Sequence, residues 1–426
     1  MLLIYSPQSN TRLQYICKFI FEEILHKSYS ITTDYINFNK HDGNKINYSN
    51  SYFENSFQIK PQGLLLETGI TQQKIECFNF NNCKTFFKSE NSDYPFDIFA
   101  ATFYLITRYE EYLPHHKDMY GRYAHTNSLA YTEGFLNLPL INIWINDLAQ
   151  VLKNSFKNFN FQFPNFSFLP TYDIDIAWSY KQKGFLRNSA GFIKSPSIGR
   201  LTALLGLKDD PFDSYNFLDS THQLYNLKPL YFFLVAKENG IYDKNILPDN
   251  DAMQDLIKSH KEKYDIAIHP SWKSNDAIEI LKAEKEILET ICDSNIYSSR
   301  QHYIKFNLPN GYNRLIDANI KNDYSMGYGS TNGFRASVAS SFWWYDLKNE
   351  KTTTLRIHPF CFMDANCYYE QKLTLEESFK EIMHYYLQCK NANGTLITIF
   401  HNNFLGTDKQ FKGWSELYRK FIFQLQ

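Results

Sequence analysis

The sequence lacks a large net charge, paired cysteine motifs and a membrane-length apolar run, and each absence excludes a class of protein. Its 426 residues carry a formal net charge of -1, so no overall field draws the chain to nucleic acid or to an acidic membrane. No apolar run approaches the roughly 18 residues that a membrane span needs. The first residues include no basic segment, and their apolar run stops at Ser6, so we expect a β-strand there and not a signal peptide.

The seven cysteines are odd in number, and none belongs to a CxxC pair with a matching pair elsewhere. This pattern argues against a disulfide framework and against a zinc site made of cysteines. Reduced thiols fit a cytoplasmic protein, and so does the lack of signal and membrane segments. We therefore predict a cytoplasmic chain.

Hydrophobic and aromatic residues are abundant, at 43% and 17% of the chain. They are sufficient for substantial cores, and the length suggests two or three domains. Asn and Lys interrupt the apolar pattern over residues 154–165, which marks a boundary. We predict a small α+β or α/β N-terminal domain over residues 1–160 and a second domain over residues 161–426.

The N-terminal domain shows elements but no recognisable chemistry. Residues 2–5 predict a strand, and helical apolar spacing predicts helices. Arg108, Glu110 and Glu111 are interpreted as solvated or interdomain charges of the second helix. The helices are expected at residues 12–26, 96–112 and 140–152.

The second domain alternates strand and helix patterns at a spacing typical of a barrel. Residues 230–235 form a continuous apolar run, which is typical of a parallel strand covered on both faces. Ser274 is expected to cap a helix, and Thr374 and Glu377 have the spacing of a capping box. Strands are expected at residues 166–172, 230–235, 264–268, 295–299, 355–362 and 395–400. Helices are expected at residues 212–227, 251–263, 276–290, 312–320 and 375–389.

Ionisable side chains follow three of these strands. Asp173 and Asp175 come at the end of the first, His269 follows the third, and His401 follows the last. Carboxyl ends of parallel strands in a βα barrel lie on one rim, where such folds keep their active sites. Side chains at i and i+2 of an extended chain share a face, so the two carboxylates could divide the work of holding a metal ion and activating water.

Structural roles for the same residues stay open at this point. The pair Asp173 and Asp175 is also compatible with an Asx-type turn or a helix cap. His269 and His401 could be structural histidines that hydrogen-bond to neighbouring carbonyls. Arg300, which follows another strand, could orient a carboxylate and lower its pKa, or it could be an ordinary surface charge.

Five motifs, taken in order, resemble those of the polysaccharide deacetylases, the NodB-like superfamily of carbohydrate esterase family 4. Residues 96–101 and 107–111 further resemble an N-terminal domain of uncharacterised function in related bacterial proteins. The resemblance covers essentially the whole chain, through motifs that are individually loose and jointly fairly specific. The five motifs are Thr171-Tyr-Asp-Ile-Asp175, Ile268-His-Pro-Ser-Trp272, Arg300-Gln-His-Tyr303, Gly333-Phe-Arg335 and Ile399-Phe-His401.

The resemblance implies a distorted (β/α) barrel with fewer than eight strands, a divalent metal that is usually zinc, and removal of acetyl groups from an N- or O-acetylated sugar or polysaccharide. It implies that Asp173 is the catalytic base and that Asp175 is the metal-binding aspartate, displaced by one position from the usual Asp-Asp. It implies that His269 is the first metal histidine. Arg300 would orient the base, and His401 would act as the acid.

One position departs from the family pattern. A second metal histidine is usual four residues after the first, and that position is Lys273, whose cation cannot replace a ligand. Either another group completes the metal site, or metal binding is weak or absent. His302, two residues after Arg300 on the same rim, is our candidate for the missing ligand, and Ser271 or water is the alternative.

Three interpretations of function follow. The first is a zinc-dependent carbohydrate deacetylase. The second is a deacetylase-like module that binds glycans without hydrolysing them, which Lys273 favours. The third is a metal hydrolase that acts on another small amide or on a phosphoester. Trp343, Trp344 and Tyr328 could stack on sugar rings, or they could be core aromatics.

Overall fold

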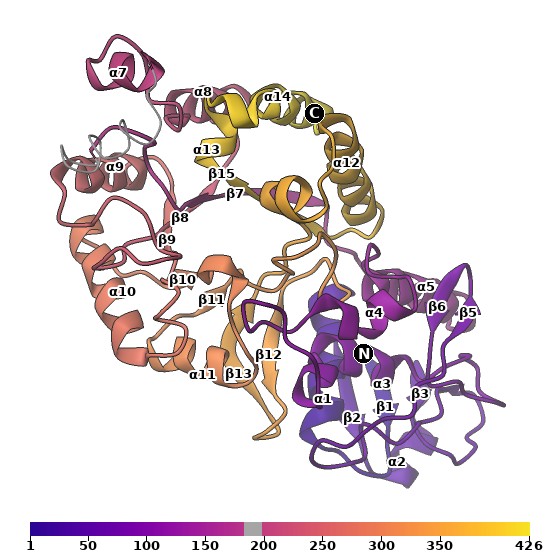
Figure 1. Cartoon of the computed structure of the whole chain (residues 1–426). Coiled ribbons are helices and arrows are strands. Elements are labelled where there is room, and N and C mark those ends of the chain that lie inside the picture. The colour runs from indigo at the N-terminus through magenta and orange to yellow at the C-terminus, as the bar shows by residue number, and fades with distance from the viewer. Residues whose placement is uncertain (183–197) are drawn as a thin grey trace.

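The two halves of the chain contain separate sheets in the computed structural model, which describes residues 1–182 and 198–426 (Figure 1). The N-terminal sheet is parallel, in the order β2-β1-β3-β4, and a small antiparallel pair, β5-β6, lies apart from it. Its strands are β1 (Leu2–Tyr5), β2 (Tyr29–Thr32), β3 (Lys45–Asn47), β4 (Phe57–Gln58), β5 (Phe78–Phe80) and β6 (Cys83–Thr85). Its helices are α1 (Thr11–Cys17), α2 (Tyr35–Lys40), α3 (Ile98–Ile106), α4 (Leu129–Thr132) and α5 (Leu140–Ser155).

The helices expected in the N-terminal half are present, with two differences. The helix expected over residues 12–26 is α1 followed by a π-helical segment, Lys18–Ile24. The helix expected over residues 96–112 was too long, because α3 ends at Ile106. Arg108 then takes a left-handed backbone conformation, with φ 55°, and a 3-10 turn follows over Tyr109–Tyr112. A non-glycine residue with positive φ cannot continue an α-helix.

The second half is built on a nine-stranded sheet in the order β12-β13-β11-β10-β9-β8-β7-β15-β14. Neighbouring strands are parallel, except that β12 runs antiparallel to β13. The strands are β7 (Ser167–Ile174), β8 (Leu230–Phe233), β9 (Asp265–Ile268), β10 (Ser298–Ser299), β11 (Asn322–Asp323), β12 (Phe342–Asp346), β13 (Lys351–Ile357), β14 (Phe362–Met363) and β15 (Thr395–His401). The helices are α7 (Ile198–Leu204), α8 (Tyr215–Tyr225), α9 (Asp251–Lys261), α10 (Ile278–Cys292), α11 (Asn310–Asp317), α12 (Leu375–Asn391), α13 (Asn402–Leu405) and α14 (Trp414–Gln424).

The strands of this sheet curve around a centre, with helices from α8 to α12 and α14 on the outside (Figure 1). The two edge strands, β12 and β14, are not hydrogen-bonded to each other, so the described strands form an open sheet and no closed barrel. Two features end the sheet: β12 folds back antiparallel, and β14 has only two residues. The α/β class is confirmed.

Local signals in the second half were correct at one cap and wrong at another. Thr374 and Glu377 form the expected capping box at the start of α12. Ser274 does not cap α10, which begins at Ile278; its hydroxyl donates to the Ser271 carbonyl instead. The strand expected over residues 355–362 is two strands, β13 and β14, because Pro359 between them has no N–H for a ladder.

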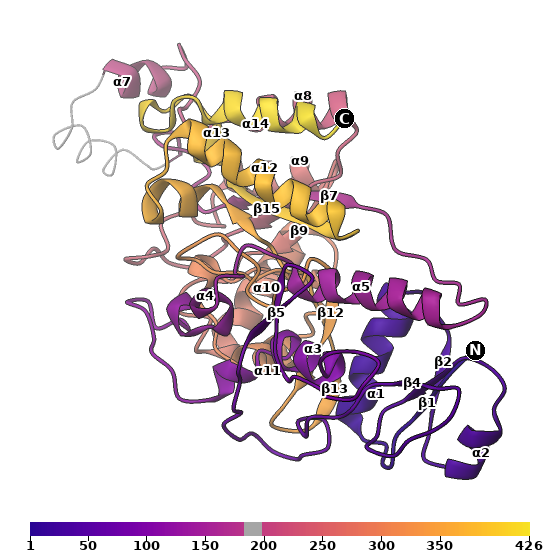
Figure 2. The same ribbon diagram turned by 90° about the vertical axis from the view of Figure 1, so that its right-hand side faces the viewer.

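One hydrophobic core runs through both halves of the chain. Helix α5 lies on the side of the N-terminal half that faces the larger sheet (Figure 2), and the Ile141 amide donates to the Ser337 carbonyl. Across the same boundary the Tyr15 hydroxyl donates to the Trp343 carbonyl. The N-terminal half therefore packs directly against the second half. Within the described ranges, no helix has the length and apolarity to cross a membrane.

Candidate metal centre

A cavity of about 440 Å³ opens at the carboxyl ends of β7, β9, β10 and β15. Asp173, Asp175, His269, His302 and His401 all line it, although they come from four segments that are far apart in the sequence. Parallel strands bring their carboxyl ends to one edge, which explains why these side chains converge. The cavity has the size of a small-molecule site.

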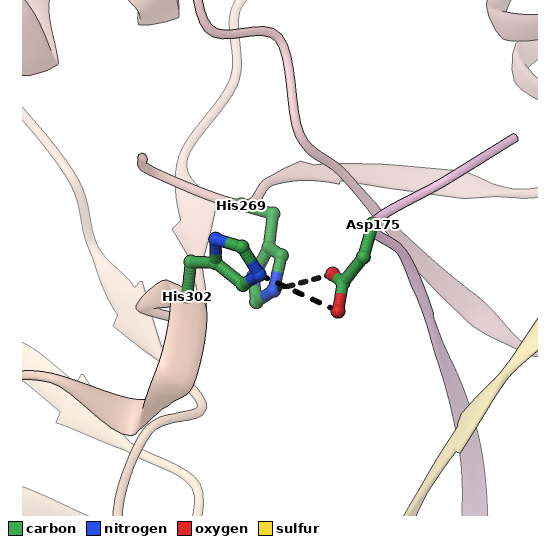
Figure 3. Close-up of side chains that lie close together, drawn as sticks. All are labelled: Asp175, His269 and His302. Carbon is green, nitrogen blue, oxygen red and sulfur yellow. Dashed lines mark ion pairs between the residues drawn. The ribbon is translucent and has the colours of Figure 1, made fainter. Parts of the chain in front are cut away.

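Three of these residues offer ligand atoms to one point. One atom each from Asp175, His269 and His302 lie within 4.8 Å of one another (Figure 3). Asp175 Oδ1 lies 3.0 Å from His269 Nε2, and Asp175 Oδ2 lies 3.4 Å from His302 Nε2. His302, predicted from its place on the rim, therefore lies where a ligand to a shared ion would lie.

The Nδ1 atoms of His269 and His302 already have hydrogen-bond partners in the protein. His269 Nδ1 lies 2.6 Å from the Arg300 carbonyl oxygen, which can only accept, so this nitrogen carries a proton. His302 Nδ1 lies 2.8 Å from Asp243 Oδ1, and that carboxylate also accepts the Trp272 amide. Bonds of this kind fix ring orientation and leave Nε2 for a metal. Both Nε2 atoms face Asp175.

The charges of this cluster suit a cation. Burial tends to raise the pKa of Asp175, but His302 and His269 outweigh burial and hold that pKa well below its ordinary value. Burial tends to lower the pKa of His302, but Asp175 and Asp243 outweigh it and raise the pKa to about 9. Asp175 Oδ1 is buried and accepts no hydrogen bond from the described residues. Once His302 gives up its Nε2 proton to an incoming ion, two imidazoles and one carboxylate form a donor set that zinc binds, so the residues fit a divalent ion.

Asp173 lies beside the three ligand atoms and is held by Arg300. Arg300 Nη1 donates to Asp173 Oδ1 over 2.7 Å, and Arg300 Nε donates to the Tyr324 carbonyl. The guanidinium also lies 4.1 Å from the centre of the Phe232 ring. Asp173 Oδ2 is 3.7 Å from His269 Nε2. One carboxylate oxygen is thus fixed, while the other faces the candidate metal position.

His401 is paired with a carboxylate that the sequence analysis missed. Asp364 Oδ1 lies 2.6 Å from His401 Nδ1, and Asp364 Oδ2 accepts the His401 amide. Burial lowers the pKa of His401, but Asp364, with Asp175 and Asp173, outweighs it and raises that pKa to about 10. Asp364 directly follows β14, so its place at a strand end is the signal that could have found it.

Lys273 takes no part in the cavity. Its Nζ lies 2.5 Å from Glu238 Oε1, and both side chains are exposed to solvent. Ser271, the alternative ligand, does not line the cavity, and its amide donates to Glu284. His302, and not Lys273 or Ser271, therefore lies beside Asp175 and His269.

The aromatics expected to stack on sugars are elsewhere. Trp343, Trp344 and Tyr328 do not line the cavity, and Trp344 and Tyr328 are each only 2% exposed. Trp344 and Tyr328 are core aromatics, which is the alternative that the sequence left open. Tyr120 and Tyr303 line the cavity instead. Tyr120 comes from the half in which the sequence showed no chemistry.

Comparisons with known proteins give one family match and several remote structural matches. A family of unknown function, DUF7033, matches residues 2–157. A candidate polysaccharide deacetylase from Mycobacterium smegmatis is 12% identical, with a TM-score of 0.41, over 62% of this chain and 84% of its own. An allantoinase is 11% identical, with a TM-score of 0.37, over 61% and 83%. A polysaccharide deacetylase from Bacillus cereus is 10% identical, with a TM-score of 0.32, over 61% and 88%. No curated protein matches the chain.

Proposed function

We propose that this chain is a divalent-metal-dependent hydrolase that removes acetyl groups from an N- or O-acetylated carbohydrate. The observation that carries the proposal is the convergence of Asp175, His269 and His302, with both imidazoles oriented through Nδ1. Buried Asp173 beside them supplies a candidate base. The order of the five sequence motifs supports an acetylated sugar as the substrate.

The ligand set and its surroundings suit zinc in a catalytic setting. Two histidines and one carboxylate leave further coordination positions open, which is typical of catalytic zinc. When bound, a divalent ion supplies Lewis acidity, which makes water more acidic and favours negative charge on a carbonyl oxygen. Asp175 is the anionic ligand, and His269 and His302 are the neutral ones.

Asp173 accepts a proton from the attacking water in this proposal. Its Oδ1 is held by Arg300, so Oδ2 is the atom that receives the proton. A guanidinium that donates to a carboxylate fixes the orientation of that carboxylate. Arg300 is a positioning residue, since it acts through Asp173.

His401 protonates the leaving group. Its Nδ1 is bound by Asp364, so Nε2 is the atom that can donate. Protonation matters most for an amine, which leaves poorly without it. Because Asp364 raises the pKa of His401, the imidazole is protonated at neutral pH and is ready to act as the acid.

We also propose that residues 1–160 and 161–426 are two domains, and that the open nine-stranded sheet is a distorted NodB-type barrel. The separate sheets and the parallel order of the larger one support this. The shared core between the halves means that the domains pack as one unit.

Metal content and acetate release test the proposed function. After incubation with zinc, cobalt or manganese and removal of free ions, elemental analysis should find one ion per chain. The loaded protein should release acetate from acetylated oligosaccharides, and His302→Ala should lose both properties. A wild-type protein without a stoichiometric ion contradicts the proposal. A loaded protein that hydrolyses only small amides or phosphoesters would keep the metal site and change the substrate.

A further inference from the structure

A turn from the N-terminal half forms one wall of the candidate metal cavity. Tyr120 and Arg122 line the cavity together with His302 and Tyr303. The turn is closed by a bridge between Lys117 and Tyr123 and by a hydrogen bond from the Arg122 amide to Asp118. Figure 1 shows the purple segment after α3 crossing to the strands of the second half.

Arg122 is almost fully buried, with 5% of its surface exposed, and its contacts are specific. Its Nε donates to Asp118 Oδ2 over 2.6 Å, and its Nη1 donates to the Tyr303 carbonyl over 2.7 Å. The guanidinium stacks on Tyr120 at 4.7 Å. A Cβ on Gly329 would lie 2.0 Å from Arg122 Nη1, so only glycine permits this approach.

The segment that Arg122 contacts through the Tyr303 carbonyl has a strained backbone, and it also carries His302. Tyr303 and Ile304 both have positive φ, at 59° and 53°. A β-branched residue rarely adopts this conformation, and strain of this kind persists only where the surroundings impose it. The Tyr303 ring contacts Tyr120 and Trp272, at 5.4 Å and 5.6 Å between centroids. The segment that carries His302 and Tyr303 is therefore held in place by contacts from the N-terminal half.

We infer that Arg122 is a positioning residue for the metal site, and that the N-terminal half completes this site by holding the Tyr303 carbonyl next to His302. The inference rests on the proposed function, since it takes His302 as a ligand. A ring whose Nδ1 is tied to Asp243 still needs its backbone fixed if Nε2 is to face Asp175. Loss of such outer contacts typically lowers metal affinity about 10-fold to 100-fold.

Arg122 could instead serve only to dock the two halves, and Arg12 provides the matched control. Arg12 is also a buried arginine of the N-terminal half, and it pairs with Glu350 of the second half, over 2.9 Å and 2.5 Å. Arg12 and Glu350 do not line the cavity. Arg12→Met therefore removes a docking contact without touching the turn that carries His302.

The test compares Arg122→Met with Arg12→Met in the full chain. Zinc affinity is measured by competition with a chromophoric chelator, and amide hydrogen exchange is followed over residues 301–306. We expect Arg122→Met to weaken zinc binding by about 10-fold and to accelerate exchange in this segment. Arg12→Met should lower the melting temperature while leaving zinc affinity and exchange at residues 301–306 as in the wild type.

Equal effects of both variants, or no effect of Arg122→Met on either measurement, would overturn the inference. The exchange measurement needs no ion. If the wild-type protein binds no zinc, the proposed function fails, and the exchange rates still decide whether Arg122 holds the turn. If zinc binds and only the Arg122 result is negative, the proposed function stands without this inference.

Discussion

Two clusters of buried charged groups lie in this molecule, and they differ in how their polar atoms are paired. Between the two halves, Glu111 accepts from Arg108 Nε over 2.7 Å and from Arg335 Nε and Nη2 over 2.8 Å and 2.6 Å. At the cavity, Asp175 faces imidazole nitrogens whose rings already donate through Nδ1. The first cluster pairs donors with acceptors, whereas the second points ligand atoms at one position.

This difference separates a structural cluster from the candidate metal centre. A buried carboxylate between two guanidiniums has its charge balanced by the protein itself. A carboxylate and two oriented imidazoles are balanced by a proton or by a metal ion, so they respond to what binds. The interdomain alternative for Arg108 and Glu111 is the one the structure shows, since Arg335 belongs to the second half.

The largest expected effect concerns Asp173→Asn. The amide keeps an oxygen for Arg300 but cannot accept a proton, so we expect acetate release to fall by about 10²- to 10⁴-fold, the usual contribution of a general base. Metal content should not change, because Asp175 and the two histidines remain. Elemental analysis and acetate release check this, with Asp243→Asn as the matched control, which should weaken metal binding instead. Turnover retained in Asp173→Asn would place the base elsewhere.

Whereas Asp173→Asn should lower the activity of the protein, Glu111→Gln should lower its stability and leave its metal binding intact. It leaves Arg108 and Arg335 buried without their shared negative charge, and breaking a buried pair typically costs about 3–5 kcal/mol of stability. Denaturant unfolding measures this cost, and the folded protein should still bind one ion. Glu376→Gln is the control, because Glu376 and its partner Lys380 are exposed and their loss should hardly change stability. A Glu111→Gln variant as stable as the wild type would show that the cluster around Glu111 does not stabilise the fold.

The pH dependence of stability sharpens the same contrast. Burial raises the pKa of Glu111, but Arg335 and Arg108 outweigh it and lower the pKa from 4.5 to about 2. A lowered folded-state pKa means that the ionised group stabilises the protein above its unfolded value, and that this stabilisation is lost as pH falls from about 4.5 to 2. At about 1.4 kcal/mol per pH unit, the loss amounts to about 3 kcal/mol.

Unfolding free energies of wild type and Glu111→Gln, measured between pH 6 and pH 2, check this expectation. The gap between the two proteins should narrow as the pH falls. Burial raises the pKa of Glu110 and the charge of Glu111 adds to that rise, so the same two measurements in a Glu110→Gln background isolate the titration of Glu111. A gap that stays constant over this range would show that the charge of Glu111 is not what Arg108 and Arg335 require.

Residues at strand ends could be predicted from the sequence, because a short pattern fixes both the strand and its direction. Asp173, Asp175, His269, Arg300 and His401 were found in this way, and the resemblance to a known family added an expected role for each. Their meeting at one cavity follows from parallel strands alone. Asp364 follows β14 in the same way, so the same pattern marks it as well.

Contacts made through tertiary structure could not be predicted. Asp243 lies in a loop, and its bond to His302 joins residues 59 positions apart. Arg122 meets the Tyr303 carbonyl over a separation of 181 positions, and nothing near Arg122 in the sequence marks it as part of a site. The open edge of the sheet is also invisible, since periodicity predicts strands and not whether the first and last of them pair.

The smallest expected effect is that of Lys273→His, which restores the usual second histidine to the sequence. Lys273 points to Glu238 at the surface and is not part of the cavity lining, so a histidine there should leave zinc affinity unchanged. The decisive form is the double variant with His302→Ala, measured by the same chelator competition. Because position 273 does not line the cavity, the added histidine should not restore binding lost with His302. Restored binding would show that the metal site uses the family position after all, and it would make His302 a structural histidine of the same kind as the paired groups around Glu111.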